Sequence, residues 1–268
     1  GSLGPPKVVG VPDEARPALD GLLKFIAAKS WDERLNYSML PDQVAEKGRA
    51  YYQATKDGPI SVDEIHYLRH ENNPQVGRGM HAVFVLFHRG WDFEIPVMVE
   101  VENGEARVDW LTFVEFKDDM LSKFMADPSM DGRWRFHVAL TRAHYFDDDV
   151  PDRESKDAFE IAPPMPTGRQ MFAFTDKNSQ LARKLATTIT WDKMITWAIV
   201  ELEWSNEGGK PWVELTAVPQ LNWYSSAGAP AESVSAEPAS AQPPTPSSSG
   251  EGIPAATLRS TSPVPQGR

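Results

Sequence analysis

The sequence predicts an α+β protein in which helices pack on a curved antiparallel sheet and a small five-stranded β-barrel with one helix follows. Three observations support this fold class. Apolar residues recur at helical spacing over 13–54, and from about residue 61 they alternate as they do in strands. A second series of strand patterns, interrupted by one helical pattern, occupies 130–224. At 268 residues and 41% hydrophobic composition, the chain has enough apolar side chains for two cores.

The chain is expected to divide into four parts. These are a linker at 1–12, an α+β domain at 13–127, a barrel domain at 130–224 and a tail at 225–268. The tail holds eight of the chain's 23 prolines and ten serines, and it has no aromatic residue. Because such a composition offers almost nothing to bury, the tail is expected to be disordered.

Helices are expected over the first part of the α+β domain. Four apolar residues fall at steps of three and four: Leu19, Leu22, Leu23 and Ile26. Further on, Ser30 followed by Glu33 is a capping-box pattern that marks the start of a helix. Pro41 interrupts the stretch that follows, so two short helices are predicted over 30–54.

Strand patterns follow the helices. They are expected at 61–71, 80–88, 91–102 and 105–115. Pro96 suggests an edge position or a bulge, because proline cannot donate to a sheet ladder. Asn103 and Gly104 form a strong hairpin signal. A short helix is predicted over 117–125 to close this domain.

The barrel domain is predicted from five strand patterns and one helix. The strands are expected at 133–146, 158–162, 170–175, 194–204 and 211–219, with the helix over 178–188. An acidic loop follows the first of these strands. It contains Asp147, Asp148, Asp149 and Asp152 beside His144. The loop lacks the spacing and the glycine of a calcium-binding EF-hand, so it is interpreted as a solvated loop.

The first domain resembles the nuclear-transport-factor-2-like (cystatin-like) cone fold. The resemblance rests on the order of elements, on SWDERLNYSMLPDQVAEKGRAYY at 30–52 and on VDW at 108–110. It implies a sheet wrapped around a long helix with an apolar pocket. The pattern is also similar in kind to uncharacterised planctomycete and verrucomicrobial proteins, which often carry an upstream hydrophobic anchor. The second domain, with three strands, a helix and two strands, resembles an OB-fold barrel.

The cone resemblance points to one candidate catalytic residue. An enzyme of that superfamily needs a carboxylate or histidine in the pocket as a general base. Asp109 is the candidate, but alternation along 105–115 places it opposite the core-facing pair Val108 and Trp110. Tyr51, Tyr52 and Trp110 are the pocket candidates for ligand binding. No other catalytic residue is predicted.

No metal site and no cofactor are predicted. The chain has no cysteine, which excludes thiol catalysis and cysteine-based zinc or iron–sulfur sites. His66 and His70 are four residues apart, but on a strand that spacing separates them by roughly 13 Å. Phosphate-binding and hydrolase motifs of the GxxxxGK, GxGxxG, GxSxG and HExxH types do not occur.

The charge of the chain disfavours nucleic acid as a partner. The net charge is −11, and no basic groove is apparent in the sequence of the barrel domain. Aromatic residues are abundant there, but aromatic residues on strands are usually core. No apolar stretch of the length that spans a bilayer occurs.

The sequence therefore predicts a non-catalytic ligand-binding or protein-interaction protein. The expected partner is a small apolar ligand or another protein, and a homodimer through the sheet is a further expectation. A small isomerase or dehydratase acting from the cone pocket is the alternative, and oligonucleotide binding by the barrel is the second alternative. The chain begins at Gly1 without Met, and an extracytoplasmic location with the anchor removed is the expectation.

Overall fold

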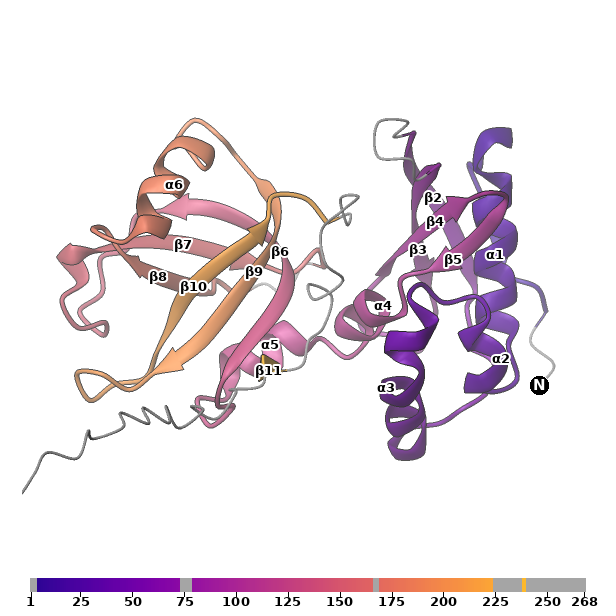
Figure 1. Cartoon of the computed structure of the whole chain (residues 1–268), viewed down its shortest axis with the longest axis horizontal. Coiled ribbons are helices and arrows are strands. Elements are labelled where there is room, and N and C mark those ends of the chain that lie inside the picture. Colours follow the sequence, from indigo (N-terminus) through magenta and orange to yellow (C-terminus); the bar gives the residue numbers. More distant parts are fainter. Residues whose placement is uncertain (1–3, 73–78, 166–168, 224–237, 240–268) are drawn as a thin grey trace, which may run out of the picture.

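The computed structural model describes residues 4–72, 79–165, 169–223 and 238–239. Within these residues the chain is α+β and forms two bodies, one around a five-stranded sheet and one around a closed barrel (Figure 1). The predicted fold class is confirmed. The predicted disorder over 225–268 lies outside the described residues, apart from the two-residue strand β11 (Pro238–Ala239).

The helices over residues 13–54 lie where the sequence predicts them. They are η1 (Asp13–Ala15), α1 (Arg16–Ala27), α2 (Trp31–Leu35) and α3 (Pro41–Ala54). The Ser30 hydroxyl caps α2 by accepting a hydrogen bond of 3.3 Å from the Glu33 amide. Pro41 is the first residue of α3, where its missing amide hydrogen costs nothing. The predicted pair of short helices is confirmed.

The first sheet has the strand order β1-β2-β3-β4-β5. Its strands are β1 (Lys7–Val9), β2 (Glu64–Asn72), β3 (Met80–Phe87), β4 (Ile95–Glu102) and β5 (Glu105–Val108). All neighbours are antiparallel except β1, which pairs with β2 in parallel. Within the predicted linker over 1–12, Lys7–Val9 thus form a strand that the sequence did not predict. Two valines that favour extended backbone, flanked by Pro and Gly residues, add a strand to the exposed edge of β2.

Pro96 lies on β4, which has β3 on one side and β5 on the other. It pairs with Val85 of β3, while β5 pairs only with Val99 to Glu102. At Pro96 the strand therefore has a neighbour on one side only, so the missing amide hydrogen leaves no ladder bond unmade.

The strand predicted over 105–115 is wrong beyond Val108. The chain turns there into helix α4 (Trp110–Lys117), and α5 (Met120–Ala126) follows. Asp109 is the N-cap of α4, and its carboxylate accepts a 3.1 Å hydrogen bond from the Thr112 amide. Asp109 is also buried rather than on an outward face, with 8% of its surface exposed.

The second body is a closed barrel with α6 (Gln180–Thr188) between its third and fourth strands. The strands are β6 (Arg133–Ala143), β7 (Lys156–Ala162), β8 (Phe172–Asp176), β9 (Thr196–Ser205) and β10 (Trp212–Gln220). Their order is β6-β7-β8-β10-β9, with β6 and β9 paired to close the barrel and β8 parallel to β10. This topology is compatible with an OB-like barrel. Strand β11 pairs with the start of β6.

Each body has its own hydrophobic core. The first is built around buried residues of α1, α4 and the sheet, among them Leu22, Phe25, Ile65, Phe84 and Phe113. The second fills the barrel, with Phe136, Phe159, Ile161, Val200 and Leu215 among its members. Helix α5 contributes Leu121 and Phe124 to the barrel core although it precedes the predicted boundary at 127–130. The predicted domain limits stay a prediction.

Candidate functional site

The three pocket candidates of the first body lie together. Trp110 packs against Tyr51 and Tyr52 with ring centroids 5.8 and 6.2 Å away, and its Nε1 donates to the Tyr52 hydroxyl at 3.2 Å. Trp31 completes this cluster at 4.7 Å from Trp110. Burial raises the pKa of Tyr52, and burial together with Asp118 raises the pKa of Tyr51. Both hydroxyls therefore stay protonated at neutral pH, and the rings fill space against one another.

Asp109 belongs to a buried polar network at the junction of the two bodies. Its Oδ2 accepts from the Thr112 hydroxyl at 2.8 Å, and this hydroxyl lies 3.4 Å from His137 Nε2 of β6. The other ring nitrogen of His137, Nδ1, is 2.8 Å from Glu115 Oε2, and Glu115 Oε1 accepts from the His137 amide at 2.7 Å. Thr112 and Glu115 of helix α4 thus lie against His137, and the N-cap residue Asp109 joins the network through the Thr112 hydroxyl.

The electrostatics of this network favour a retained proton. Burial raises the pKa of Glu115. Burial alone would lower the pKa of His137, but the facing Glu115 carboxylate and the nearby Asp109 outweigh it, and the net direction is upward. His137 is 2% and Glu115 4% exposed, and the rings of Phe116 and Trp223 stand edge-on to the imidazole. The network is sealed by side chains from both bodies.

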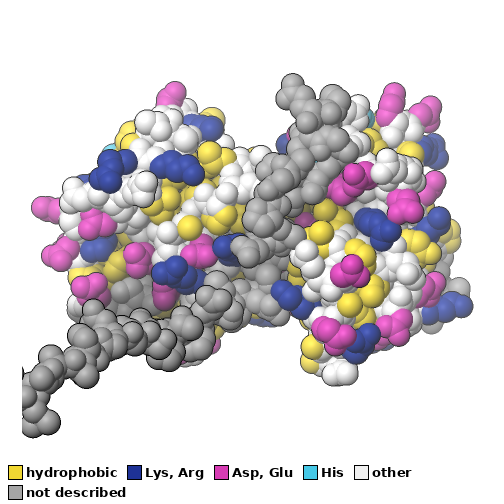
Figure 2. All heavy atoms as spheres, in the orientation of Figure 1, with side chains coloured by type: hydrophobic (Ala, Val, Ile, Leu, Met, Phe, Trp, Pro, Cys, Tyr) yellow, Lys and Arg dark blue, Asp and Glu magenta, His cyan; other side chains and the backbone are white. Residues whose placement is uncertain are grey.

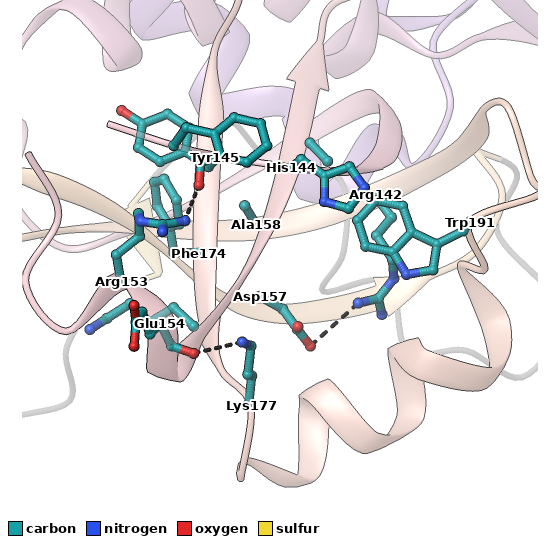
Figure 3. Close-up of a pocket in the computed structure, with 13 residues that line it drawn as sticks. Arg142, His144, Tyr145, Arg153, Glu154, Asp157, Ala158, Phe174, Lys177 and Trp191 are labelled. Atoms are coloured by element: carbon teal, nitrogen blue, oxygen red, sulfur yellow. Dashed lines mark hydrogen bonds and ion pairs between the residues drawn. The ribbon is translucent and has the colours of Figure 1, made fainter. Parts of the chain in front are cut away.

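A different arrangement lies on the barrel, where an open groove of about 460 Å³ runs along the outer side of β7 and β8 (Figure 3). The end of β6, the loop after it, β7, β8 and the two ends of the α6 segment all contribute to it. Its polar and aromatic lining includes Arg142, His144, Tyr145, Arg153, Lys156 and Trp191. This volume is within the range of pockets that hold small ligands.

Flat side chains form a column at one end of this groove. The His144 ring stacks on Trp191 at 4.1 Å with 15° between the planes, and the Phe146 ring lies 6.1 Å from that of His144 at an angle of 21°. The Arg142 guanidinium continues the column, 5.7 Å from the Trp191 centroid and 5.1 Å from that of Phe159 in the core. Phe146 is 80% and Trp191 57% exposed. The column therefore reaches from the barrel core to solvent.

Three cationic side chains line the rest of the groove. Arg153 donates to the Tyr145 carbonyl, Lys156 to the Pro151 carbonyl, and Lys177 to the Glu154 carbonyl at 2.6 Å. Within the described residues, none of the three is paired with a carboxylate. Asp157 is paired with Arg142 at 3.4 Å. The Arg142 Nη2 atom is buried and has no hydrogen-bond partner in the described part of the chain.

The other histidines singled out from the sequence lie on β2 and form local pairs. His66 Nε2 is 2.6 Å from Glu64 Oε2, and His70 Nδ1 is 2.6 Å from the Tyr67 hydroxyl. Among the described residues no group of three His, Asp or Glu side chains could hold a metal ion. No described helix combines the length and apolar character that crossing a bilayer requires.

Comparison with known proteins gives no relative from which a function could be inferred, so the functional conclusion rests on the fold and on the groove. No family model, no curated protein and no solved structure matches this chain.

Sequence reasoning missed both the buried network and the ring column. His137 and Glu115 are 22 positions apart, and no local pattern pairs a strand histidine with a helix carboxylate across two bodies. The sequence predicts His144 in a strand over 133–146, beside the acidic loop, but β6 ends at Ala143, and Trp191 lies 47 positions away in the segment before β9. The available signal was the run His144, Tyr145 and Phe146 directly before four closely spaced aspartates.

Proposed function

We propose that this protein is a non-catalytic binding protein whose barrel carries the ligand-binding surface. One observation carries the proposal. The acid and base groups that meet at the junction, Asp109, Glu115 and His137, are sealed between the two bodies. The groove that is open, by contrast, is lined by stacked rings and cations rather than by an acid–base pair in an apolar cavity. Ligand binding is therefore possible at the open groove, whereas the acid and base groups of the junction are closed to a substrate.

The finer fold assignments belong to this proposal. The first body is taken to be a nuclear-transport-factor-2-like, cystatin-like scaffold, and the barrel is taken to be an OB fold. The strand order of the closed barrel supports the second assignment. OB folds commonly bind ligands on their second and third strands and on the loop between the first two strands. The groove here lies against β7, β8 and the loop after β6. Fold analogy alone does not specify a ligand.

A thermal-shift screen of the whole chain tests the proposal. Small molecules that bind the native state are expected to raise the midpoint in proportion to the logarithm of their concentration. The same library is assayed for isomerisation and dehydration. The proposal is overturned if a compound is turned over and the Asp109→Asn variant, which keeps a capping side chain, abolishes the turnover. A library without a single stabilising compound also contradicts it.

A further inference from the structure

We propose that the barrel groove binds a small ligand that joins one flat ring to one anionic group, as in a nucleoside monophosphate or an aromatic carboxylate. This inference rests on the proposed function and names the class of ligand for it. The juxtaposition that carries it is a solvent-exposed ring column at one end of the groove and unpaired cations along the remainder (Figure 3).

The ring column provides the stacking surface. His144 and Trp191 are already parallel and in contact, and Phe146 extends from the same loop with most of its surface in solvent. Large exposed aromatic side chains gain free energy when another flat group covers them. Arg142 stands beneath Trp191 and adds a cation to the buried end of the column. A planar ligand ring could therefore stack on the exposed end of this column.

The cations provide the anion-binding end. Arg153, Lys156 and Lys177 donate to neutral carbonyl groups, and none of them forms an ion pair within the described residues, although Glu154 also lines the groove and Glu214 interacts with Lys156 at longer range. An anionic group entering between them would form charge-assisted hydrogen bonds, which are stronger than bonds to carbonyl groups. Arg142 Nη2, buried at the same groove, still lacks an acceptor, and leaving such a donor unpaired is costly.

The surrounding charge limits the ligand to a single anionic group. Asp147, Asp148, Asp149 and Asp152 all lie in the loop that borders the groove, and the chain as a whole has a net charge of −11. On the face drawn in Figure 2, Lys and Arg side chains are scattered among Asp and Glu and form no continuous basic track. A long polyanion needs such a track, so this observation favours a small anion over an oligonucleotide.

Titration calorimetry with the full chain tests the inference directly. The probes are adenosine monophosphate and naphthoate, which share a flat ring and an anion, and the comparison compounds are adenosine and inorganic phosphate. We expect at least one of the two probes to bind at least tenfold more tightly than both adenosine, which has a flat ring and no anion, and inorganic phosphate, which is an anion without a ring. Which probe binds more tightly distinguishes a phosphate ligand from a carboxylate ligand.

Two substitutions with matched controls locate the binding. Trp191→Ala removes the ring on which His144 stacks, so that the column loses its order, and is expected to weaken the tighter probe by about tenfold. Lys177→Ala removes an exposed cation of the groove and is expected to weaken it by about fivefold. The controls are Met194→Ala, which is 85% exposed in the same segment as Trp191, and Lys184→Ala, an exposed lysine on α6 outside the groove. Neither control is expected to change the affinity.

Three results overturn the inference. The first is that neither probe binds, and the second is that each groove variant has the same affinity as its control. The third is that a single-stranded hexanucleotide binds more tightly than both probes with a steep dependence on salt, which would support nucleic-acid recognition instead. Each of these leaves the broader proposal intact as long as the thermal-shift screen finds another ligand. If that screen finds none, the proposed function fails with it, so the two failures are distinguishable.

Discussion

Arg34 shows how much of the first body depends on a single buried side chain. It has no exposed surface and donates hydrogen bonds to the carbonyl groups of Phe25 and Ala28, each at 3.1 Å. Its Nη1 lies 3.6 Å from Asp57, and its guanidinium packs on the ring of Tyr52. The arginine therefore joins the end of α1, helix α2 and the segment before β2.

Replacing this arginine by a residue of similar length is expected to destabilise the fold strongly. Arg34→Met removes the donors and leaves Asp57 and the buried carbonyl groups without their partner, at a cost of about 3 kcal/mol. Chemical denaturation of the variant measures this. Arg49→Met is the control, because Arg49 is paired with Glu46 and Asp32 on the surface, and it is expected to leave the midpoint unchanged. Equal effects of the two changes would contradict the role given to Arg34.

The His137–Glu115 pair makes stability depend on pH. The pKa of His137 is raised in the folded state by Glu115 and Asp109, so the folded chain binds this proton more tightly than the unfolded chain does. The stabilisation is present in full below the unfolded histidine value of about 6.5 and is lost as pH rises through the higher folded value. The raised pKa of Glu115 acts in the same direction.

The His137→Gln variant tests this dependence against the wild type at each pH. The free energy of unfolding of the wild type should exceed that of the variant by more at about pH 5.5 than at about pH 8.5. A difference that is constant over this range would show that the pair is not the titrating element. Glu115→Gln provides the matching control, because it removes the carboxylate that raises the His137 pKa but keeps hydrogen-bonding capacity. The free energy of unfolding of this variant should depend less on pH than that of the wild type.

At the scale of elements, the passage from β5 to α4 depends on Asp109. Val108 is the last strand residue, and the Asp109 carboxylate accepts from both the amide and the hydroxyl of Thr112. This double contact ends the strand and starts the helix within one residue. The residue that the sequence offered as a candidate base has a structural role in the fold.

Removing the cap should therefore cost stability. Asp109→Ala is expected to destabilise the chain by about 1–2 kcal/mol, and Asp109→Ser to recover most of the loss, because serine also caps helices. Ser179→Ala, which removes the cap of α6, gives the scale for an ordinary capping contact in the same chain. If alanine and serine at position 109 were equally destabilising, capping would not be the reason for the loss.

Helix α4 was predicted as a strand, and the reason is physical. A surface helix shows an apolar stripe on one side, but both sides of α4 are covered. Trp110, Phe113 and Phe116 belong to the first core, while Thr112 and Glu115 face His137 of the barrel. Apolar and polar positions then follow no helical period. Helices α1, α2 and α3, which have a solvent face or clear start signals, were predicted.

At the scale of the whole molecule, α4 and α5 bind the two bodies into one unit. Phe116 packs against Trp223 at 5.4 Å, and the Trp223 indole donates to the Val138 carbonyl of β6. Trp204 of β9 donates to the Phe124 carbonyl of α5 at 2.9 Å. The succession of strands and helix along the barrel sequence was predicted from local patterns, but these contacts join residues 80 or more positions apart and have no local signature.

Scanning calorimetry of the full chain is expected to show one cooperative transition rather than two. The buried network and the Trp223 contact would both be lost if either body unfolded alone, so partial unfolding exposes apolar and polar groups together. His137→Ala, which removes the central side chain of the junction, is expected to separate the transition into two. Two resolved peaks in the wild type would show that the bodies are energetically independent.

The position of α5 also bears on how this architecture could be reused in evolution. A cut between residues 127 and 130 would take Leu121 and Phe124 away from the barrel and leave Phe136 uncovered. A cut before α4 would instead remove Trp110, Phe113 and Phe116 from the first core. A cut between α4 and α5 would leave each core its own helix but would separate Glu115 from His137 and Phe116 from Trp223. The two halves are therefore expected to be inherited together.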